Sequence, residues 1–146
     1  MIAAAPGVNA ALDLRARLAG QLTQSFPGTC MHEVLFDDRF LKDTGVTTLD
    51  FAKALIDEGF HPMTMYFPLV VHGALLIEPT ETESKASLDQ FADTVNGLAA
   101  RAKSGDTAGF QTAPRLTPRR RLDETGAARK PRLRWRPEPP RQEAAD

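Results

Sequence analysis

Apolar residues near the start of the chain recur at spacings of three and four, the periodicity of one helical face. The stripe consists of Ala11, Leu14, Leu18 and Leu22. Arg15 and Arg17 lie outside it, and Gly20 followed by Phe26-Pro27-Gly28 supplies a stop. The pattern predicts an amphipathic helix over residues 8–21.

A second helical pattern occupies the segment GVTTLDFAKALIDEGF. Thr47 and Asp50 are three residues apart, the spacing of a capping box that satisfies free N–H groups at a helix start. The apolar stripe that follows consists of Leu49, Ala52, Leu55 and Ile56. Gly59 supplies the left-handed residue with which helices commonly end. We therefore expect a second amphipathic helix here.

Three short apolar segments have the composition of strands. The first, CMHEVLF, is closed by Asp37-Asp38 and would place His32 and Val34 on one face, with Glu33 and Leu35 on the other. The other two lie in a stretch bounded by prolines, over residues 63–67 and 74–77. They predict two strands, or one strand and an extended crossing.

A third helix is expected after Pro79. Thr80 and Glu83 have the S/T-x-x-E spacing of a capping box, and Arg101 and Lys103 would lie at the C-terminal end, where the helix dipole favours cations. The apolar stripe consists of Leu88, Phe91, Ala92, Val95, Leu98 and Ala99. The acidic stretch IEPTETESK would then serve the start of this helix.

The order helix, strand, helix, strand, strand, helix predicts a two-layer α/β domain, with a short, mostly antiparallel sheet covered by helices. Periodicity disappears beyond Ser104, where prolines and arginines cluster. We therefore expect a folded unit over residues 8–104 and an extended, basic tail over residues 105–146.

Composition narrows the class of protein further. The chain has 146 residues, 42% of them apolar, which suits one small domain and excludes two large ones. Its net charge of −1 hides an asymmetry, because residues 1–110 carry 8 basic and 14 acidic groups and residues 111–146 carry 10 and 5. Cys30 is the only cysteine, so an internal disulfide is excluded and a reducing, cytoplasmic setting fits. Apolar runs too short to cross a bilayer predict a soluble protein without membrane contact.

Few residues suggest chemistry by themselves. Among His32, His61 and His72, His61 draws most attention, because Gly59 and Pro62 fix the chain around it. The carboxylates of Glu78, Glu81 and Glu83 could in principle bind a hard cation, but capping explains them more simply and no metal-site signature is present. Cys30 has no local basic cluster that would activate it.

The basic tail leaves a nucleic-acid alternative open. Its segments PRRR and ARKPRLRWR could neutralise phosphates, and Trp135 could stack on a base. Asp123 and Glu124 interrupt the run, and no fold that reads nucleic acid accompanies it, which makes this alternative the weaker one.

Several segments together resemble one enzyme family, the glycine cleavage system P-protein, a pyridoxal-phosphate-dependent glycine dehydrogenase (decarboxylating). They are CMHEVLF, GVTTLDFAKALIDEGFHPMTMYFP, ALLIEPTETESKASLDQF and PRLTPRRRLDETGAARKPRLRW. The resemblance covers roughly residues 9–135 and is to the C-terminal part of the second subunit, in bacteria that divide this enzyme into two chains. Its most specific pieces are GFHPMT and IEPTETESK.

The resemblance implies the small C-terminal domain of a fold-type-I pyridoxal-phosphate enzyme, packed against a large domain that holds the cofactor. In this family glycine loses its carboxylate as CO₂, and the aminomethyl group passes to the lipoyl arm of the H-protein. The implied partners are therefore the rest of the P-protein and the lipoylated H-protein. Residues 59–66 and 78–81 would form part of the active-site wall, through His61, Pro62, Thr64, Glu78, Thr80 and Glu81. The resemblance implies that these residues position other groups and do not transfer protons.

The sequence also departs from the family pattern. The Schiff-base lysine of the family follows a histidine, and no His-Lys pair occurs here. Met63 replaces a second proline, and MIAAAPG resembles a substituted start on a truncated gene. We therefore expect a fragment that lacks the large domain and is inactive alone, with no catalytic residue and no bound cofactor of its own. The competing interpretations are a non-catalytic module that docks through the exposed domain seam, and nucleic-acid binding by residues 115–136.

Overall fold

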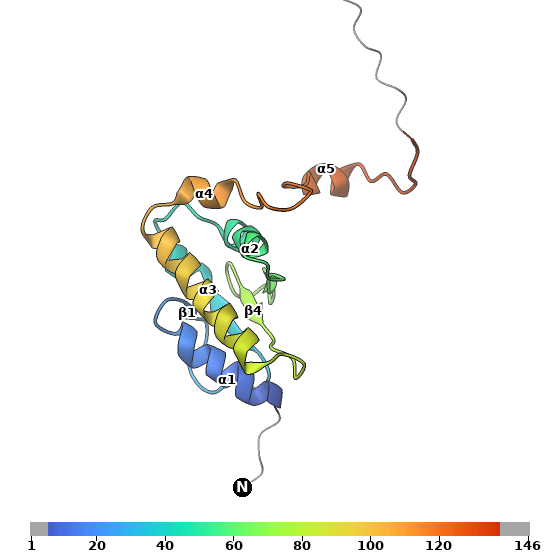
Figure 1. The fold of residues 1–146 in the computed structure, drawn as a ribbon. Helices are drawn as coiled ribbons and strands as arrows, with labels where there is room; N and C mark the ends of the chain where they lie inside the picture. Colours follow the sequence, from blue (N-terminus) through green and yellow to red (C-terminus); the bar gives the residue numbers. More distant parts are fainter. Residues whose placement is uncertain (1–5, 138–146) are drawn as a thin grey trace, which may run out of the picture.

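The computed structural model describes residues 6–137 and contains one four-stranded sheet (Figure 1). The strands are β1 (Thr23–Gln24), β2 (Val34–Asp37), β3 (Thr64–Met65) and β4 (Leu75–Ile77). They follow the order β1-β2-β4-β3, and every neighbouring pair is antiparallel. The prediction of a short, mostly antiparallel sheet is thus confirmed. The expected substituted start falls mainly on residues 1–5, and these, like residues 138–146, lie outside the described part.

Two helices pack against each other and onto the sheet. Helix α1 (Pro6–Leu18) contacts both α3 (Lys85–Lys103) and β2 (Figure 1). Its buried stripe of Leu14 and Leu18 meets buried residues of α3 such as Val95, as the apolar periodicity predicted. Arg17 of α1 also pairs with Asp89 and with Asp93, at 3.1 Å, on α3. Helix and sheet therefore form the two expected layers.

Helix α2 (Thr48–Asp57) has the start and the stop that its sequence predicted. The Thr47 side chain accepts a hydrogen bond from the Asp50 N–H at 3.1 Å, and Asp50 Oδ2 accepts one from the Thr47 N–H at 2.9 Å. Gly59 follows in the left-handed region, with φ of 86°. Phe51 and Leu55 are fully buried against α3 and its surroundings.

The expected capping of α3 is wrong in its residues. The helix begins at Lys85, and Ser84 is the cap, accepting a hydrogen bond from the Ser87 N–H at 3.1 Å. Thr80 lies four residues earlier, where its hydroxyl pairs with that of Thr82 at 2.7 Å. Only Thr80 was predicted as the cap, and the helix starts one turn later, after Ser84.

The strands are shorter than predicted. β2 begins at Val34, so residues 30–33 precede the strand, and the expected placement of His32 on a strand face is wrong. β3 ends at Met65, because Tyr66 turns the chain with a positive φ of 58°. Neither β1 nor the 3₁₀ helix η1 (Asp38–Leu41) was predicted, because neither has a periodic apolar pattern.

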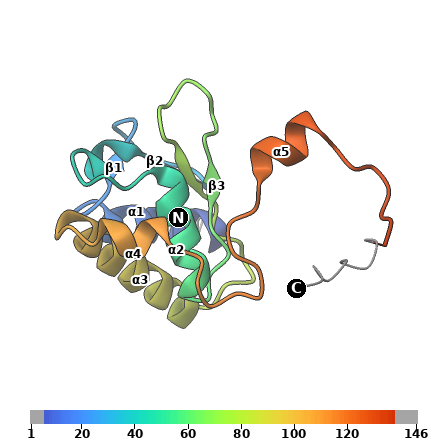
Figure 2. The same cartoon turned by 90° about the horizontal axis from the view of Figure 1, so that it is seen from above.

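The expectation of an extended chain from residue 105 is wrong for two segments. Helix α4 (Thr107–Gln111) places Phe110 in the core, where its ring stacks on that of Phe51 with centroids 6.1 Å apart. Helix α5 (Glu124–Arg129) has no buried residue; its first residue, Glu124, pairs with Lys53 of α2 at 3.6 Å, and the chain then projects from the domain, as Figures 1 and 2 show. A single buried phenylalanine was too weak a pattern to predict α4.

Candidate functional site

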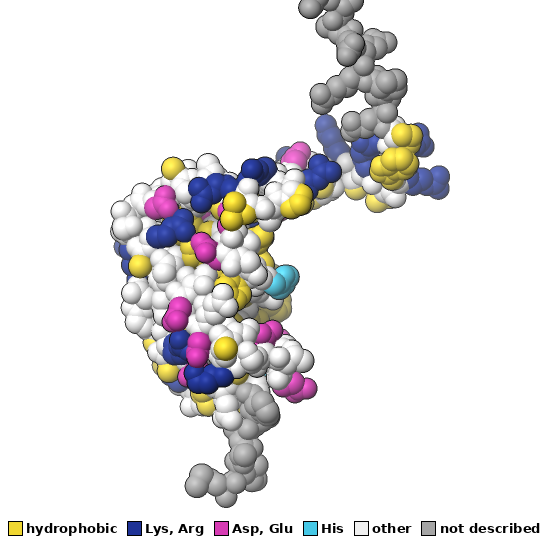
Figure 3. Space-filling view, in the orientation of Figure 1, with side chains coloured by type: hydrophobic (Ala, Val, Ile, Leu, Met, Phe, Trp, Pro, Cys, Tyr) yellow, Lys and Arg dark blue, Asp and Glu magenta, His cyan; other side chains and the backbone are white. Residues whose placement is uncertain are grey.

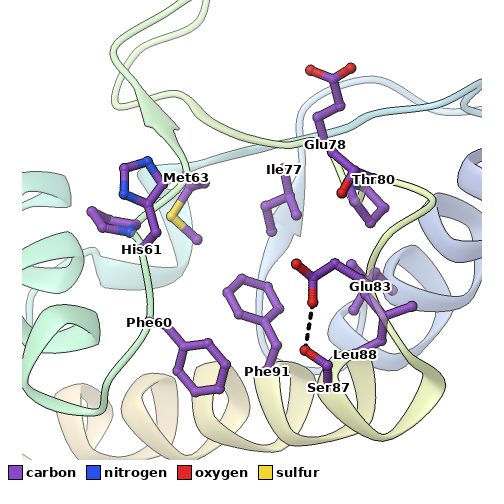
Figure 4. Close-up of a pocket in the computed structure, with 13 residues that line it drawn as sticks. Phe60, His61, Met63, Ile77, Glu78, Thr80, Glu83, Ser87, Leu88 and Phe91 are labelled. Atoms are coloured by element: carbon purple, nitrogen blue, oxygen red, sulfur yellow. Dashed lines mark hydrogen bonds between the residues drawn. The ribbon is translucent and has the colours of Figure 1, made fainter.

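A cavity of about 250 Å³ opens between the end of α2, the end of β4 and the start of α3 (Figure 4). Four of the six predicted wall residues line it, namely His61, Pro62, Glu78 and Thr80. Thr64, an exposed residue of β3, and Glu81, exposed in the turn before α3, do not line it. The fold thus brings together two segments that are 17 residues apart in the sequence.

The segment from Phe60 to Met63 is held in place at its first residue, Phe60. After Gly59 reverses the chain, the Phe60 N–H donates to the Leu55 carbonyl at 3.0 Å. The Phe60 ring then meets the ring of Phe91 on α3 edge to face, with centroids 5.4 Å apart. This arrangement fixes the backbone from which the His61 ring rises on one side of the cavity (Figure 4).

The opposite side is formed by the turn after β4. Pro79 is buried and ends the strand, while Glu78 and Thr80 on either side are exposed. The Glu78 carboxylate points away from the cavity in Figure 4, and one of its oxygens lies 3.9 Å from His32 Nε2. Glu83 accepts a hydrogen bond from the Ser87 hydroxyl at 2.6 Å. The polar groups of this side are therefore at the rim.

The floor of the cavity is apolar. Its residues are Leu14, Met63, Ile77, Leu88 and Phe91. Sequence reasoning placed Leu88 and Phe91 on the core-facing stripe of a helix, and did not foresee that this stripe continues past the core into an open cavity. Leu88 and Phe91 are therefore only half-buried. An apolar floor with polar rim groups suits contact with an uncharged surface, and it offers no strong anion-binding group.

The other candidate residues lie elsewhere. His72 Nδ1 is 2.8 Å from Asp38 Oδ2, and this hydrogen-bonded carboxylate raises the pKa of His72 above its usual value. Cys30 is half-buried and packs against the core. Within residues 6–137, no three His, Cys, Asp or Glu side chains gather in a group that could hold a metal ion.

Two arginines of the PRRR segment serve the fold itself. Arg121 pairs with Asp50 Oδ1 at 2.7 Å and donates to the carbonyls of Phe110 and Ala113 at 3.0 and 2.8 Å. Arg120 donates to the Pro114 carbonyl at 3.3 Å. The sequence suggested phosphate contacts for these side chains. Arg121 instead binds Asp50 inside the protein, and the burial of Asp50 was not apparent from the sequence.

The fold and the cavity define a class of protein: a small two-layer α/β domain with an open apolar pocket. Residues 8–113 match the family model described as glycine dehydrogenase, C-terminal domain, and the chain belongs to this family. The resemblance inferred from the sequence is thereby confirmed. No helix in the described range is long and apolar enough to cross a membrane.

Several similar curated proteins are named probable glycine dehydrogenase (decarboxylating) subunit 2. The protein of Caulobacter vibrioides is 67% identical over 125 residues, which is 85% of this chain and 24% of the relative. Those of Kosmotoga olearia and Listeria monocytogenes are 48% and 50% identical, over 85% and 77% of this chain and 26% and 23% of theirs. The chain therefore spans about a quarter of the length of these relatives.

Proposed function

We propose that this chain forms the small C-terminal domain of a pyridoxal-phosphate-dependent glycine dehydrogenase, and that it works only together with the remainder of that enzyme. The observation that carries the proposal is the cavity, because the two segments with the most specific resemblance, GFHPMT and IEPTETESK, both line it. The family membership of residues 8–113 supports the same conclusion.

The residues of the cavity do not fit pyridoxal phosphate as its principal holders. The cofactor needs a lysine for covalent attachment and strong donors for its phosphate. The lining residues include neither lysine nor arginine. Lys53 and Lys85 instead pair with Glu124 and Asp89, at 3.6 and 2.7 Å. We therefore assign the cofactor to a part of the enzyme that this chain does not span.

The chain's own contribution is a wall that positions and shields. His61 and Thr80 present polar atoms at the rim of an apolar floor, and this floor would exclude water once the large domain covers it. Thr64, Glu78 and Glu81 are exposed and would contact the large domain. In the assembled enzyme, glycine would lose CO₂ and the aminomethyl group would pass to the lipoyl arm of the H-protein.

A reconstituted enzyme tests the proposal directly. This chain would replace the matching segment of the Caulobacter vibrioides subunit 2, and the chimera would be assayed for CO₂ release from glycine with subunit 1 and lipoylated H-protein. We expect activity from the chimera and none from the chain alone. A lysine adduct of pyridoxal phosphate with the isolated chain, seen by its visible absorbance, would contradict the proposal.

A matched pair of variants examines the wall. His61→Ala in the chimera should lower activity, because the ring forms one side of the cavity, whereas His32→Ala, exposed and outside the cavity, should leave it within about two-fold, as is usual for surface positions. Equal activity of the two variants would argue against a role for His61 at the site.

A further inference from the structure

The last described part of the chain divides into an anchor, residues 114–124, and an arm, residues 125–137. At the start of the anchor, the N–H groups of Arg115 and Leu116 donate to the Asp57 carboxylate at 2.6–2.7 Å. Further on, Arg121 holds Asp50 and two backbone carbonyls. The base of the arm is therefore fixed to α2 and α4 by charged hydrogen bonds.

The arm itself contacts almost nothing. Every side chain from residue 127 to residue 137 is exposed, and α5 buries none of its residues. Leu133 and Trp135 are 90% and 86% exposed, although both are large and apolar. Figures 1 and 2 show the arm projecting away from the domain, and Figure 3 shows apolar and basic side chains gathered on it.

The sequence of the arm has the pattern of a strand-like ligand. In RLRWR, Arg132, Arg134 and Arg136 alternate with Leu133 and Trp135, so an extended backbone places the apolar pair on one face and the guanidinium groups on the other. Residues 115–137 carry nine basic and two acidic side chains. Trp and Arg are the residue types that dominate binding energy in protein interfaces. The complementary surface is a groove with an apolar floor and an acidic wall.

We infer that the arm binds the remainder of the subunit 2 polypeptide, the part of the relatives' length that this chain does not span. This inference rests on the proposed function. The length of the relatives supports the occupant, because about three quarters of the Caulobacter protein lies outside the match. That match leaves 21 of the 146 residues uncovered, whereas 33 follow Ala113, so it includes at least 12 residues beyond the family-model segment. These residues correspond to the anchor, so the relative shares at least the segment that holds the arm.

Trypsin provides the test, because the arm offers cleavage after Arg129, Arg132 and Arg134. In the isolated chain these bonds should be the first to be cut, as mass spectrometry of the products would show. In the chimera with the Caulobacter subunit 2, their cleavage should be at least about ten-fold slower, because cleavage follows the population of the released arm. Equal rates in the chain and the chimera would overturn the inference.

Two double variants of the chimera locate the protecting contact. Leu133→Ser with Trp135→Ser should restore rapid cleavage of the arm. Leu69→Ser with Val70→Ser alters the loop between β3 and β4, where the side chains are 87% and 85% exposed, and should leave the protection intact. Protection that survives the arm variant but is lost in the loop variant would overturn the inference. All four positions are exposed, so neither change should unfold the domain.

The remaining outcomes separate this inference from the proposed function. An active chimera with an unprotected arm would support the proposed function and contradict the binding of the arm. An inactive chimera with a protected arm would support the binding of the arm and contradict the proposed function. An inactive chimera with an unprotected arm would contradict both proposals. Protection of the isolated chain by duplex DNA at about 0.15 M salt, the ionic strength of cells, would assign the arm to nucleic acid. Protection that grows with the concentration of the isolated chain would assign it to a second copy.

Discussion

His72 is the residue whose ionisation the structure determines most directly. Its ring is 91% exposed, and Nδ1 lies 2.8 and 3.1 Å from the two carboxylate oxygens of Asp38. The hydrogen bond and the charge of Asp38 raise the pKa of His72. A raised folded-state pKa adds stability that is fully present below the unfolded value of about 6.5 and is lost as pH rises through the folded value.

Asp38→Asn should therefore lower the pKa of His72, as followed by the imidazole proton shifts in NMR titrations. The wild-type chain should also lose a little stability between mildly acidic and alkaline pH, and the variant should lack this component. Glu33→Gln removes a different carboxylate and serves as the control. An unchanged His72 titration in Asp38→Asn would mean that the pair does not form in solution.

Gly73 and Gly59 both adopt the left-handed region, with φ of 58° and 86°, but their surroundings differ. A Cβ at Gly59 would meet nothing, whereas a Cβ at Gly73 would overlap the Asp38 carboxyl group. Gly59→Ala should cost about 1–2 kcal/mol from backbone strain alone. Gly73→Ala should lower the free energy of unfolding further and disturb the His72 pair, as denaturant titrations would measure. Equal losses would show that Asp38 moves aside freely.

At the scale of elements, the residue that caps α3 differs from the one that the sequence pattern predicted. Ser84 caps the helix, while the Thr80 hydroxyl pairs with the hydroxyl of Thr82. Ser84→Ala should therefore destabilise the chain by about 1 kcal/mol, the usual value of an N-cap. Thr80→Ala should change the free energy of unfolding by less than about 0.5 kcal/mol. If chemical denaturation showed a larger loss of stability for Thr80→Ala than for Ser84→Ala, Thr80 would be the cap, as first expected from the sequence.

The elements that sequence reasoning found share a strong local signal. Thr47, Asp50 and Gly59 mark α2 through their own backbone and side-chain chemistry, so its two ends were predictable. β1 has two residues, Thr23 and Gln24, that form a strand only because β2 lies beside them. α4 depends on the stacking of Phe110 on a ring distant in sequence. Such elements are created by tertiary contacts, which local patterns do not contain.

At the scale of the whole molecule, the resemblance selected six wall residues, and four of them, His61, Pro62, Glu78 and Thr80, line one cavity. Thr64 and Glu81 do not line it, and the shape of the cavity was not foreseen. The apolar floor came from residues assigned to the core, and the outward direction of Glu78 depends on the turn at Pro79. Their roles in catalysis stay predictions.

The link between the domain and its basic segment gives the last prediction. Burial raises the pKa of Asp50, but hydrogen bonds from Thr47 and Arg121 outweigh it, so the pKa is lowered overall. A lowered pKa contributes stability that is present above the unfolded value of about 3.9 and is lost as pH falls through the folded value. Arg121→Ala should thus cost about 1–2 kcal/mol at pH 7, allowing for the partial exposure of the arginine. The difference from the wild type should narrow in acid, where Asp50 is protonated in both proteins.

Denaturant unfolding at about pH 7, 5 and 3 would measure this difference on both sides of the usual carboxylate range. Arg119→Ala provides the control, because it removes an exposed arginine two positions away and should cost less than about 0.5 kcal/mol. If the loss of unfolding free energy in Arg121→Ala does not vary with pH, the stabilising effect of Arg121 comes from its hydrogen bonds to the carbonyls of Phe110 and Ala113 alone. A cost that narrows in acid would show that the ion pair with Asp50 joins residues 114–124 to the domain.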